Sequence, residues 1–268
     1  MIKATLGLTH EPFHRNQAPL LPPQQQIAEI LHIHAQHGGF AVILGAPGVG
    51  KTVLREHLEQ RTDRGETIVA SVSRTLHSYL NLLLQLADAF KLDAPLRQLE
   101  SALIQTAYAH VRERKTLYLV IDEAHLLDIG VLRKLRLLFE RFPKKHLLVL
   151  LGQPDLMHTL ALLPNADIKS RITYSATLWP LADPDLRAFI STELDAVRLG
   201  ANTFDEAALD LILRNAQGNL RLARHLCHGS LLEACRDGQR QVSIAHVNDV
   251  LIQPHWRSHE QLIKGQVK

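Results

Sequence analysis

Cysteine is scarce in this 268-residue chain, which contains only Cys227 and Cys235. Two cysteines in one short segment provide neither a disulfide framework nor the ligand pattern of a zinc site. Long apolar runs are also missing, since no stretch approaches the ~20 residues of a membrane helix. The N-terminus lacks a secretion-signal pattern, because His10, Glu11 and His14 interrupt its apolar stretches. We therefore expect a cytoplasmic protein without a membrane segment.

No charge of one sign dominates the composition. The chain has 30 lysine and arginine residues against 27 acidic residues, which gives a formal net charge of +3. An excess this small is compatible with a nucleic-acid partner but does not indicate one. Apolar residues are plentiful, at 46% of the chain, which is enough to form a hydrophobic core.

Short apolar runs alternate with helical patterns in the first two thirds of the chain. This order is typical of a parallel sheet that helices cover on both faces. The expected strands are 40–44, 67–72, 117–121, 147–151 and 172–178. The expected helices are 24–37, 52–62, 76–90, 96–114 and 126–142. The predicted fold class is therefore α/β, with a five-stranded parallel sheet.

Only helical patterns follow Trp179. Segment 180–184 has the composition of a linker or sharp turn, and helices are expected over 185–198, 203–218, 220–236 and from Ser243 to just before Pro254. In the second of these, Thr203 is predicted to cap the helix while Glu206 reaches back. The expected parts are an irregular N-terminal extension 1–25, an α/β domain 26–182, a small all-α domain 183–255 and a basic tail 256–268.

The most specific motif is a glycine-rich loop that reads Gly45-Ala46-Pro47-Gly48-Val49-Gly50-Lys51-Thr52. It fits the pattern G-x-x-x-x-G-K-[ST] between an expected strand and an expected helix, and chance produces such a match in about 1% of chains this long. The glycines let backbone N–H groups point at phosphate oxygens, and the helix N-terminus adds partial positive charge. Lys51 is predicted to contact the β- and γ-phosphates of ATP, and the Thr52 hydroxyl to contact Mg²⁺.

The third expected strand ends in two adjacent carboxylates, Asp122 and Glu123. Ligands of open α/β sheets bind at the carboxyl ends of the strands. Asp122 is therefore predicted to hold Mg²⁺, directly or through water, and Glu123 to activate or orient the attacking water. Taken alone, Asp-Glu after a strand is equally a common start of a helix. With Ala124 and His125 it also resembles a helicase motif, but the chain is too short for the two tandem domains of helicases.

Three further residues are candidates for contact with the γ-phosphate. Gln153 follows the fourth expected strand, although a plain Gly-Gln-Pro-Asp turn is an equally good interpretation. Arg171 precedes the fifth strand and is a candidate arginine finger for a neighbouring subunit. Arg221 opens a helix of the C-terminal domain and is a second candidate arginine. The alternative for both arginines is an ordinary surface position.

Together these motifs resemble the AAA+ ATPases, and within them the group that includes ExeA, TnsC and MuB. The resemblance covers about residues 6–252 and includes the segments 8–13, 151–156 and 218–227. It implies a P-loop core with sheet order 5-1-4-3-2, a helical lid, and an active ring or helical filament with nucleotide between subunits. It also implies that Gln153 is sensor 1, Arg171 the finger and Arg221 sensor 2, although Ser170 stands where the group has glutamine.

The secretion-assembly member of this group carries a membrane segment and a cell-wall-binding domain after the ATPase, and this chain ends at Lys268 with neither. The resemblance therefore favours an ATPase that oligomerises on duplex DNA, recruits a transposase and regulates transposition. Candidate DNA contacts are Arg74, Arg133, Lys134 and Arg136, for which a solvated helix face is the alternative. Two other functions stay open: an ATPase that assembles or remodels a protein complex without DNA, and a switch that binds ATP without useful turnover.

Overall fold

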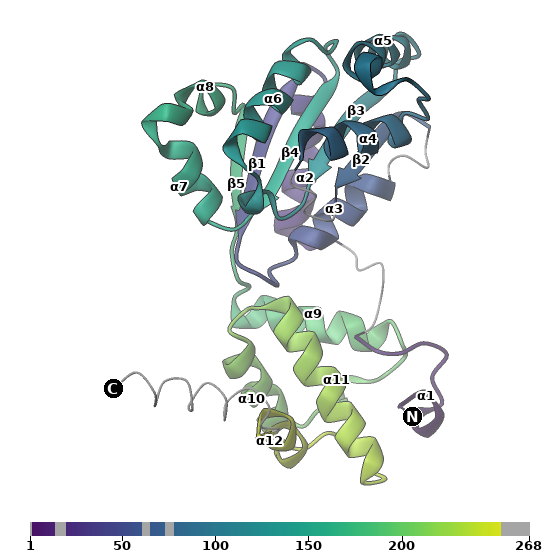
Figure 1. Cartoon of the computed structure of the whole chain (residues 1–268). Coiled ribbons are helices and arrows are strands. Elements are labelled where there is room, and N and C mark those ends of the chain that lie inside the picture. The colour runs from purple at the N-terminus through teal and green to yellow at the C-terminus, as the bar shows by residue number, and fades with distance from the viewer. Residues whose placement is uncertain (1, 14–19, 61–64, 73–77, 253–268) are drawn as a thin grey trace. The chain divides into compact units, whose positions relative to one another are not determined.

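The computed structural model describes residues 2–13, 20–60, 65–72 and 78–252. The chain divides into two compact units, one of residues 17–179 and one that combines residues 1–16 with 180–268. Each unit is described by itself below, with the element labels of Figure 1. Within the described ranges, no helix combines the length and the apolar character that crossing a membrane requires.

The unit of residues 17–179 is built on a five-stranded parallel sheet. Its strands are β1 (Gly39–Gly45), β2 (Thr67–Val72), β3 (Thr116–Ile121), β4 (His146–Gly152) and β5 (Tyr174–Leu178). Their spatial order is β2-β3-β4-β1-β5, and every neighbouring pair is parallel. Both the predicted fold class and the implied sheet order are therefore confirmed. The carboxyl ends of all five strands meet at one edge, which is where the candidate site lies.

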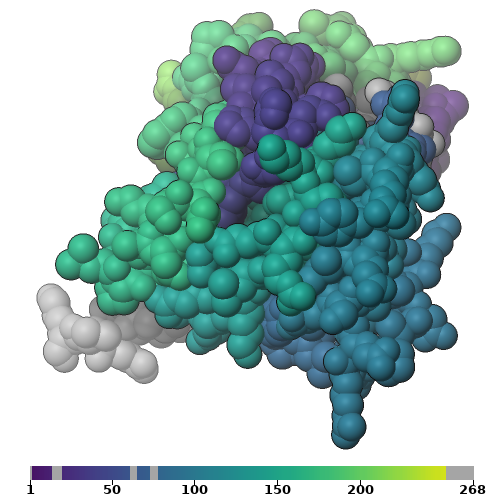
Figure 2. Space-filling view, turned by 90° about the horizontal axis from the view of Figure 1, so that it is seen from above, coloured from purple at the N-terminus to yellow at the C-terminus, as the bar shows by residue number. Residues whose placement is uncertain are grey.

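Helices cover both faces of this sheet. One face carries α2 (Pro22–Ala35) and α3 (Lys51–Gln60), and the other carries α4 (Tyr79–Ala89), α5 (Leu99–Arg112), α6 (Ile129–Glu140), α7 (Asp155–Ala161) and α8 (Ala166–Lys169). Alternate residues of β1 divide between the two faces, with Ala41 and Ile43 on the first and Phe40 and Val42 on the second. Burying a large apolar side chain stabilises the folded state by about 1.5–3 kcal/mol. The packing of helices on both faces therefore fixes the position of the strands and of the residues at their ends. In Figure 2 the blue and teal segments of α4 to α6 lie on the visible surface.

The region between β4 and β5 differs from the prediction. A plain turn is one interpretation of residues 152–155, and Pro154 is a turn residue that leads directly into α7. Neither α7 nor α8, which follows after a 3-10 turn (Leu163–Asn165), is predicted from the sequence. Both helices are short, so their apolar periodicity is too brief to recognise in the sequence. The fifth strand begins at Tyr174 rather than at residue 172. Thr173 lies just before it and contacts Phe40 of β1, since its N–H and hydroxyl donate to the Phe40 carbonyl and its hydroxyl oxygen accepts from the Phe40 N–H.

The second unit is helical, as predicted. It contains α9 (Asp183–Asp195), α10 (Glu206–Ala216), α11 (Leu220–Arg236) and α12 (Ile244–Ile252). An additional helix, α1 (Ile2–Leu6), packs on α11, so the expectation of an irregular N-terminus was wrong for these residues. The predicted cap of α10 was also wrong. Asp205 caps the helix, since its Oδ1 accepts from the Ala208 N–H at 2.6 Å, whereas Thr203 lies in a preceding 3-10 turn.

Candidate nucleotide site

The glycine-rich loop connects the carboxyl end of β1 to the first turn of α3. Gly48 and Gly50 have φ angles of 85° and 102°, which glycine adopts readily and other residues rarely do. At Gly45, a Cβ atom would lie 2.7 Å from the Val49 side chain and 3.0 Å from the Leu178 carbonyl oxygen of β5. The glycines therefore permit a turn too tight for larger residues, as the motif predicts.

Lys51 lies within this loop, with 5% of its surface exposed. Its Nζ donates to the carbonyl oxygens of Gly45 at 2.6 Å and Ala46 at 3.0 Å. Thr52 follows it in the first turn of α3 and is half-buried. The ammonium group, the hydroxyl group and the helix N-terminus are thus gathered at the loop that the motif assigns to phosphates.

Gln24 of α2 supports the loop and is not part of any motif. It is 2% exposed, its Nε2 donates to the Gly50 carbonyl at 3.0 Å, and its Oε1 accepts from the Leu21 N–H at 2.9 Å. Both ends of the buried amide are therefore satisfied. Gln24 links the start of α2 to the phosphate loop, and no spacing in the sequence indicates this contact.

Asp122 and Glu123 follow β3 at the same edge of the sheet. The Asp122 N–H donates to the Val72 carbonyl at 2.9 Å, and its Oδ1 accepts from the Glu123 N–H at 2.9 Å. Glu123 has a φ angle of 52°, a left-handed conformation that costs a non-glycine residue about 1–2 kcal/mol. Backbone strain of this kind concentrates at functional sites. The Glu123 side chain is 43% exposed, whereas Asp122 is buried.

A cationic partner of Asp122 lies outside the predicted residues. Arg55, one turn after Lys51 on α3, places its Nε 3.4 Å from Asp122 Oδ2 and its NH1 2.8 Å from Glu59 Oε1. Burial raises the pKa of Asp122, whereas its hydrogen bond from the Glu123 N–H and the charges of Arg55 and Lys51 lower that pKa. Arg55 therefore favours the ionised carboxylate that a Mg²⁺ site needs.

Replacing Arg55 with methionine is expected to lower the free energy of unfolding by about 3 kcal/mol near neutral pH, because it removes the ion-pair partner of a buried carboxylate. The Asp122 pKa is raised in the folded state, so ionising this group costs stability as the pH rises through that pKa. The cost of losing Arg55 should therefore shrink as acid protonates Asp122. Urea unfolding near neutral pH and in mild acid measures both effects.

The matched control for Arg55→Met is the same substitution in an Asp122→Asn background. There the carboxylate is already absent, so the loss of Arg55 should cost less and should depend less on pH. An equal cost in both backgrounds would contradict the pairing of Arg55 with Asp122.

His125 lies beside Glu123, a contact that the sequence did not predict. Its Nδ1 is 3.5 Å from Glu123 Oε2, and its side chain is 11% exposed. The end of β4 approaches the same turn, since a Cβ atom at Gly152 would lie 3.4 Å from the His125 backbone nitrogen. Gln153 follows Gly152, which is in register with Leu44 of β1. Glu123 and Gln153 thus lie at the ends of neighbouring strands, while contact of Gln153 with phosphate stays a prediction.

Arg171 lies at the opposite edge of the sheet. It comes just before Thr173, whose N–H donates to the Phe40 carbonyl near the amino end of β1 at 2.8 Å. The phosphate loop begins at Gly45, five residues further along this strand, or about 17 Å at 3.3 Å per residue. In Figure 1, α8 and the start of α3 lie at opposite ends of the sheet. Arg171 cannot span that distance, so any contact with a γ-phosphate must be made in another copy.

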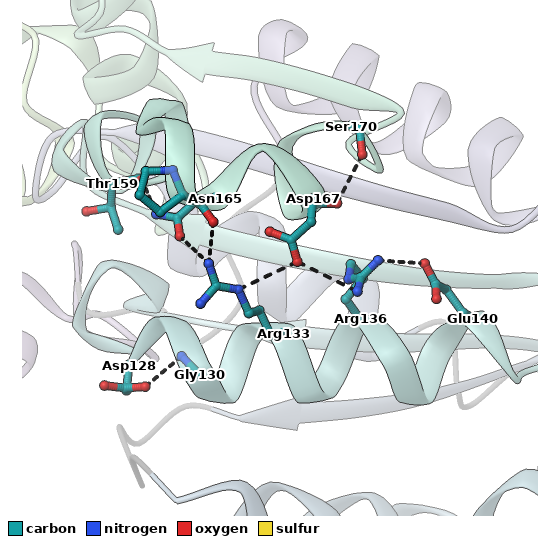
Figure 3. Close-up of polar contacts among 10 residues, drawn as sticks. Asp128, Gly130, Arg133, Arg136, Glu140, Thr159, Asn165, Asp167 and Ser170 are labelled. Carbon is teal, nitrogen blue, oxygen red and sulfur yellow. Dashed lines mark hydrogen bonds and ion pairs between the residues drawn. The ribbon is translucent and has the colours of Figure 1, made fainter.

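The residues predicted to contact DNA have different surroundings. Arg133 and Arg136 of α6 point toward Asp167 of α8 (Figure 3), with nitrogen atoms 3.6 Å from its Oδ2. Lys134 is exposed, and its Nζ lies 5.5 Å from the ring centroid of Tyr79. Arg74 and the basic tail 256–268 lie outside the described residues. Contact with DNA stays a prediction for all four residues.

Arg221 belongs to the helical unit, where it is the second residue of α11 and is exposed. Asn219 caps this helix by accepting from the Leu222 N–H at 3.0 Å. The preceding Gly218 has a φ angle of 76°, and a Cβ atom there would lie 2.2 Å from the Leu181 carbonyl oxygen, so the turn requires glycine. The sensor role of Arg221 stays a prediction.

The side chains at the carboxyl edge fit ATP with Mg²⁺. A Cβ atom at Gly45 would close the tight turn that directs backbone amides to phosphate, and Lys51 adds a cation. Thr52 and Asp122 offer oxygen ligands, which Mg²⁺ prefers. Among the described residues, no cluster of three His, Cys, Asp or Glu side chains would hold a metal by itself. The phosphates of a bound nucleotide would supply further oxygen ligands to such an ion, which would neutralise part of their charge.

Comparison with known proteins agrees with this fold. Residues 33–160 match a family model described as an AAA domain. The chain is 29% identical over 248 residues to the general secretion pathway protein A of Aeromonas hydrophila. That match covers 88% of this chain but 45% of the relative, so the chain spans less than half the length of that protein.

Solved structures with the same fold include the Aeropyrum pernix ORC2 protein in ADPNP–ADP complexes. Its TM-score is 0.70 at 18% identity, over 93% of this chain and 73% of that one. The Aeropyrum pernix ORC1 protein in complex with DNA has a TM-score of 0.67 at 19% identity, over 90% of this chain and 68% of that one. At these identities the likeness shows the fold alone, which is the P-loop fold of AAA+ proteins.

Proposed function

We propose that this chain, with its AAA+ fold, hydrolyses ATP with Mg²⁺ in a site shared between two copies. The supporting observation is the division of the candidate residues between two edges of one sheet. Lys51, Asp122 and Glu123 lie at the carboxyl edge, next to the phosphate loop. Arg171 is exposed at the amino edge, where it is out of reach of its own loop.

Each residue has one role in this proposal. Lys51 and the loop amides bind the phosphates, and Thr52 and Asp122 orient the metal shell. Glu123 accepts a proton from the attacking water, and Gln153 orients that water or the γ-phosphate. Arg171 of a neighbouring copy spreads the charge that develops on the transferred phosphoryl group.

We further propose that ATP hydrolysis by this protein drives the assembly or remodelling of a protein complex. The support is the similarity to a protein named for the general secretion pathway. The contacts of Arg133 and Arg136 also favour this role, because terminal guanidinium nitrogens of both side chains already meet protein oxygens, those of Asn165 for Arg133 and of Glu140 and Asp167 for Arg136, and are less available to phosphate.

The second candidate is an ATPase that oligomerises on duplex DNA and recruits a transposase to regulate transposition. Two observations favour DNA as a partner. A protein of the same fold has been solved in complex with DNA, and Lys134 is an exposed cation on α6. If this candidate is correct, DNA binding should need ATP and should weaken steeply as salt rises.

One assay separates these candidates. ATP turnover is measured with Mg²⁺, with and without duplex DNA, at low and moderate salt, and Lys51→Ala serves as the blank. We expect the rate of ATP turnover to be well above that of the blank and to be the same with and without DNA. Stimulation by DNA that falls with salt would instead select the transposition candidate. Turnover at the level of the blank would contradict hydrolysis and leave a nucleotide-binding switch.

A further inference from the structure

Glu140, the last residue of α6, holds two arginines with one oxygen atom. Its Oε1 lies 3.0 Å from Arg136 NH1 and 3.0 Å from Arg171 Nε. Arg136 lies on the same helix, one turn earlier, whereas Arg171 follows α8. The Glu140 carboxylate therefore links α6 to Arg171, the residue proposed to act on the nucleotide of a neighbouring copy.

Arg136 is itself held in place. Its side chain is 16% exposed, and its NH2 lies 3.6 Å from Oδ2 of Asp167. Arg133 lies 3.6 Å from the same oxygen and also donates to Asn165 Oδ1 at 3.0 Å. Figure 3 shows this row along α6, with Asp167 between the two arginines and Glu140 beyond Arg136. Positive and negative groups alternate along the row, so each charge has opposite charges beside it.

Arg171 is the last member of this row. Its side chain is 57% exposed, and it contacts Glu140 through Nε. A guanidinium group held by Nε keeps its two terminal nitrogens available, and these are the nitrogens that form a fork on phosphate oxygens. Among the described residues, Glu140 is the one carboxylate within 4 Å of Arg171. The contact thus limits the rotation of a long side chain without occupying its phosphate-binding end.

We propose that Glu140 is a positioning residue for Arg171 in the shared ATP site. The ion-paired row on α6 and α8 holds the Glu140 carboxylate, and the carboxylate holds the Arg171 guanidinium in an orientation that a neighbouring copy's γ-phosphate can meet. This inference rests on the proposed function, because it requires that Arg171 acts in another copy. Preorganised charge of this kind lowers a barrier without reorganisation during the reaction.

A purely structural role for Glu140 has different consequences. If the row only joined α6 to α8, losing Glu140 would weaken the fold of every copy that carries the change. Such a copy would then be impaired both when it donates Arg171 and when it binds nucleotide. A positioning role affects the donating copy alone, and this asymmetry can be measured.

The test mixes two variants that are each expected to be inactive. Arg171→Ala copies keep a complete nucleotide site but donate no finger. Glu123→Gln copies bind ATP without hydrolysing it but donate an intact Arg171. Mixing them should restore phosphate release at the Arg171→Ala sites. The substitution Glu140→Ala is then added either to the donating copy or to the receiving copy.

We expect Glu140→Ala in the donor to lower the restored rate on the order of tenfold, as for the loss of a charge-assisted hydrogen bond. Glu140→Gln, which keeps a neutral acceptor, should lose less. The same change in the receiver should leave the restored rate unchanged. Glu113→Gln in the donor is the matched control, because Glu113 pairs with Lys115 at 2.8 Å on the surface, away from this row.

Two results would overturn the inference: equal losses in donor and receiver, which indicate a structural role, or no loss in either. Nucleotide affinity and thermal unfolding of each variant, measured separately, detect a folding defect directly. If the mixture without any Glu140 change restores no activity, the shared site itself is wrong. The failure of this inference is therefore distinguishable from the failure of the proposed function.

Discussion

Replacing Glu123 with glutamine is expected to slow ATP turnover by about 10²–10⁴-fold, the usual contribution of a positioned general base. The carboxylate follows β3 in a left-handed conformation and is partly exposed, so it is available to a water molecule at the γ-phosphate. Glutamine has the same shape but cannot accept the proton. ATP affinity should not change, because Lys51 and the loop, not Glu123, are proposed to bind the phosphates. Single-turnover phosphate release and calorimetric ATP binding measure the two quantities separately.

The control for this substitution is Asp88→Asn, which removes an exposed carboxylate from α4 and should leave turnover as in the parent. Unchanged turnover in Glu123→Gln would remove Glu123 from its proposed role. A parallel loss of ATP affinity would show instead that Glu123 helps to bind the nucleotide.

Replacing Arg171 with alanine is expected to lower turnover on the order of 10³-fold, the low end of the range for an arginine finger. Its own phosphate loop is about 17 Å away along β1, at the other edge of the sheet. Each copy should therefore still bind ATP with parental affinity, since all the residues proposed to bind its phosphates remain. The measurements are steady-state phosphate release and equilibrium binding of a fluorescent ATP analogue.

Arg112→Ala provides the comparison for Arg171→Ala, because Arg112 is an exposed arginine at the end of α5. It should turn over ATP at the parental rate. A small effect of Arg171→Ala, comparable with that of Arg112→Ala, would mean that Arg171 is an ordinary surface residue. The site would then be complete in one chain or would take its arginine from elsewhere.

The parts of the site that the sequence predicted are those that local pattern determines. The phosphate loop needs glycines at fixed spacing, and Gly48 and Gly50 have the positive φ angles that this spacing indicates. Asp122 directly follows an apolar run, so its place at the strand end could be read from neighbouring residues. The sheet was equally predictable, since its five apolar runs are short and separated by longer helical patterns.

The missed parts are contacts between segments far apart in the chain. Arg55 meets Asp122 only because α3 packs beside the end of β3, and Gln24 meets Gly50 only through the start of α2. The spacing of residues in the sequence does not indicate such contacts. The row through Glu140 escaped prediction for a related reason, because α7 and α8 are too short for their periodicity to be recognised.

The cap of α10 illustrates a local pattern with two good interpretations. Thr203 and Asp205 are both common capping residues, and the Thr203/Glu206 spacing fits a capping box. In the structure the Thr203 hydroxyl donates to the Gly200 carbonyl, which leaves Asp205 to cap the helix. The sequence contained both candidates, and the preceding turn decided between them.

The most direct test of a shared site is the dependence of turnover on protein concentration. ATP turnover per chain is measured over a dilution series with saturating ATP and Mg²⁺, and light scattering on the same samples gives the state of association. If Arg171 completes the site of a neighbouring copy, turnover per chain should rise with association and fall toward the Arg171→Ala level as the chains separate. Turnover per chain that stays constant down to fully separated monomers would contradict the account.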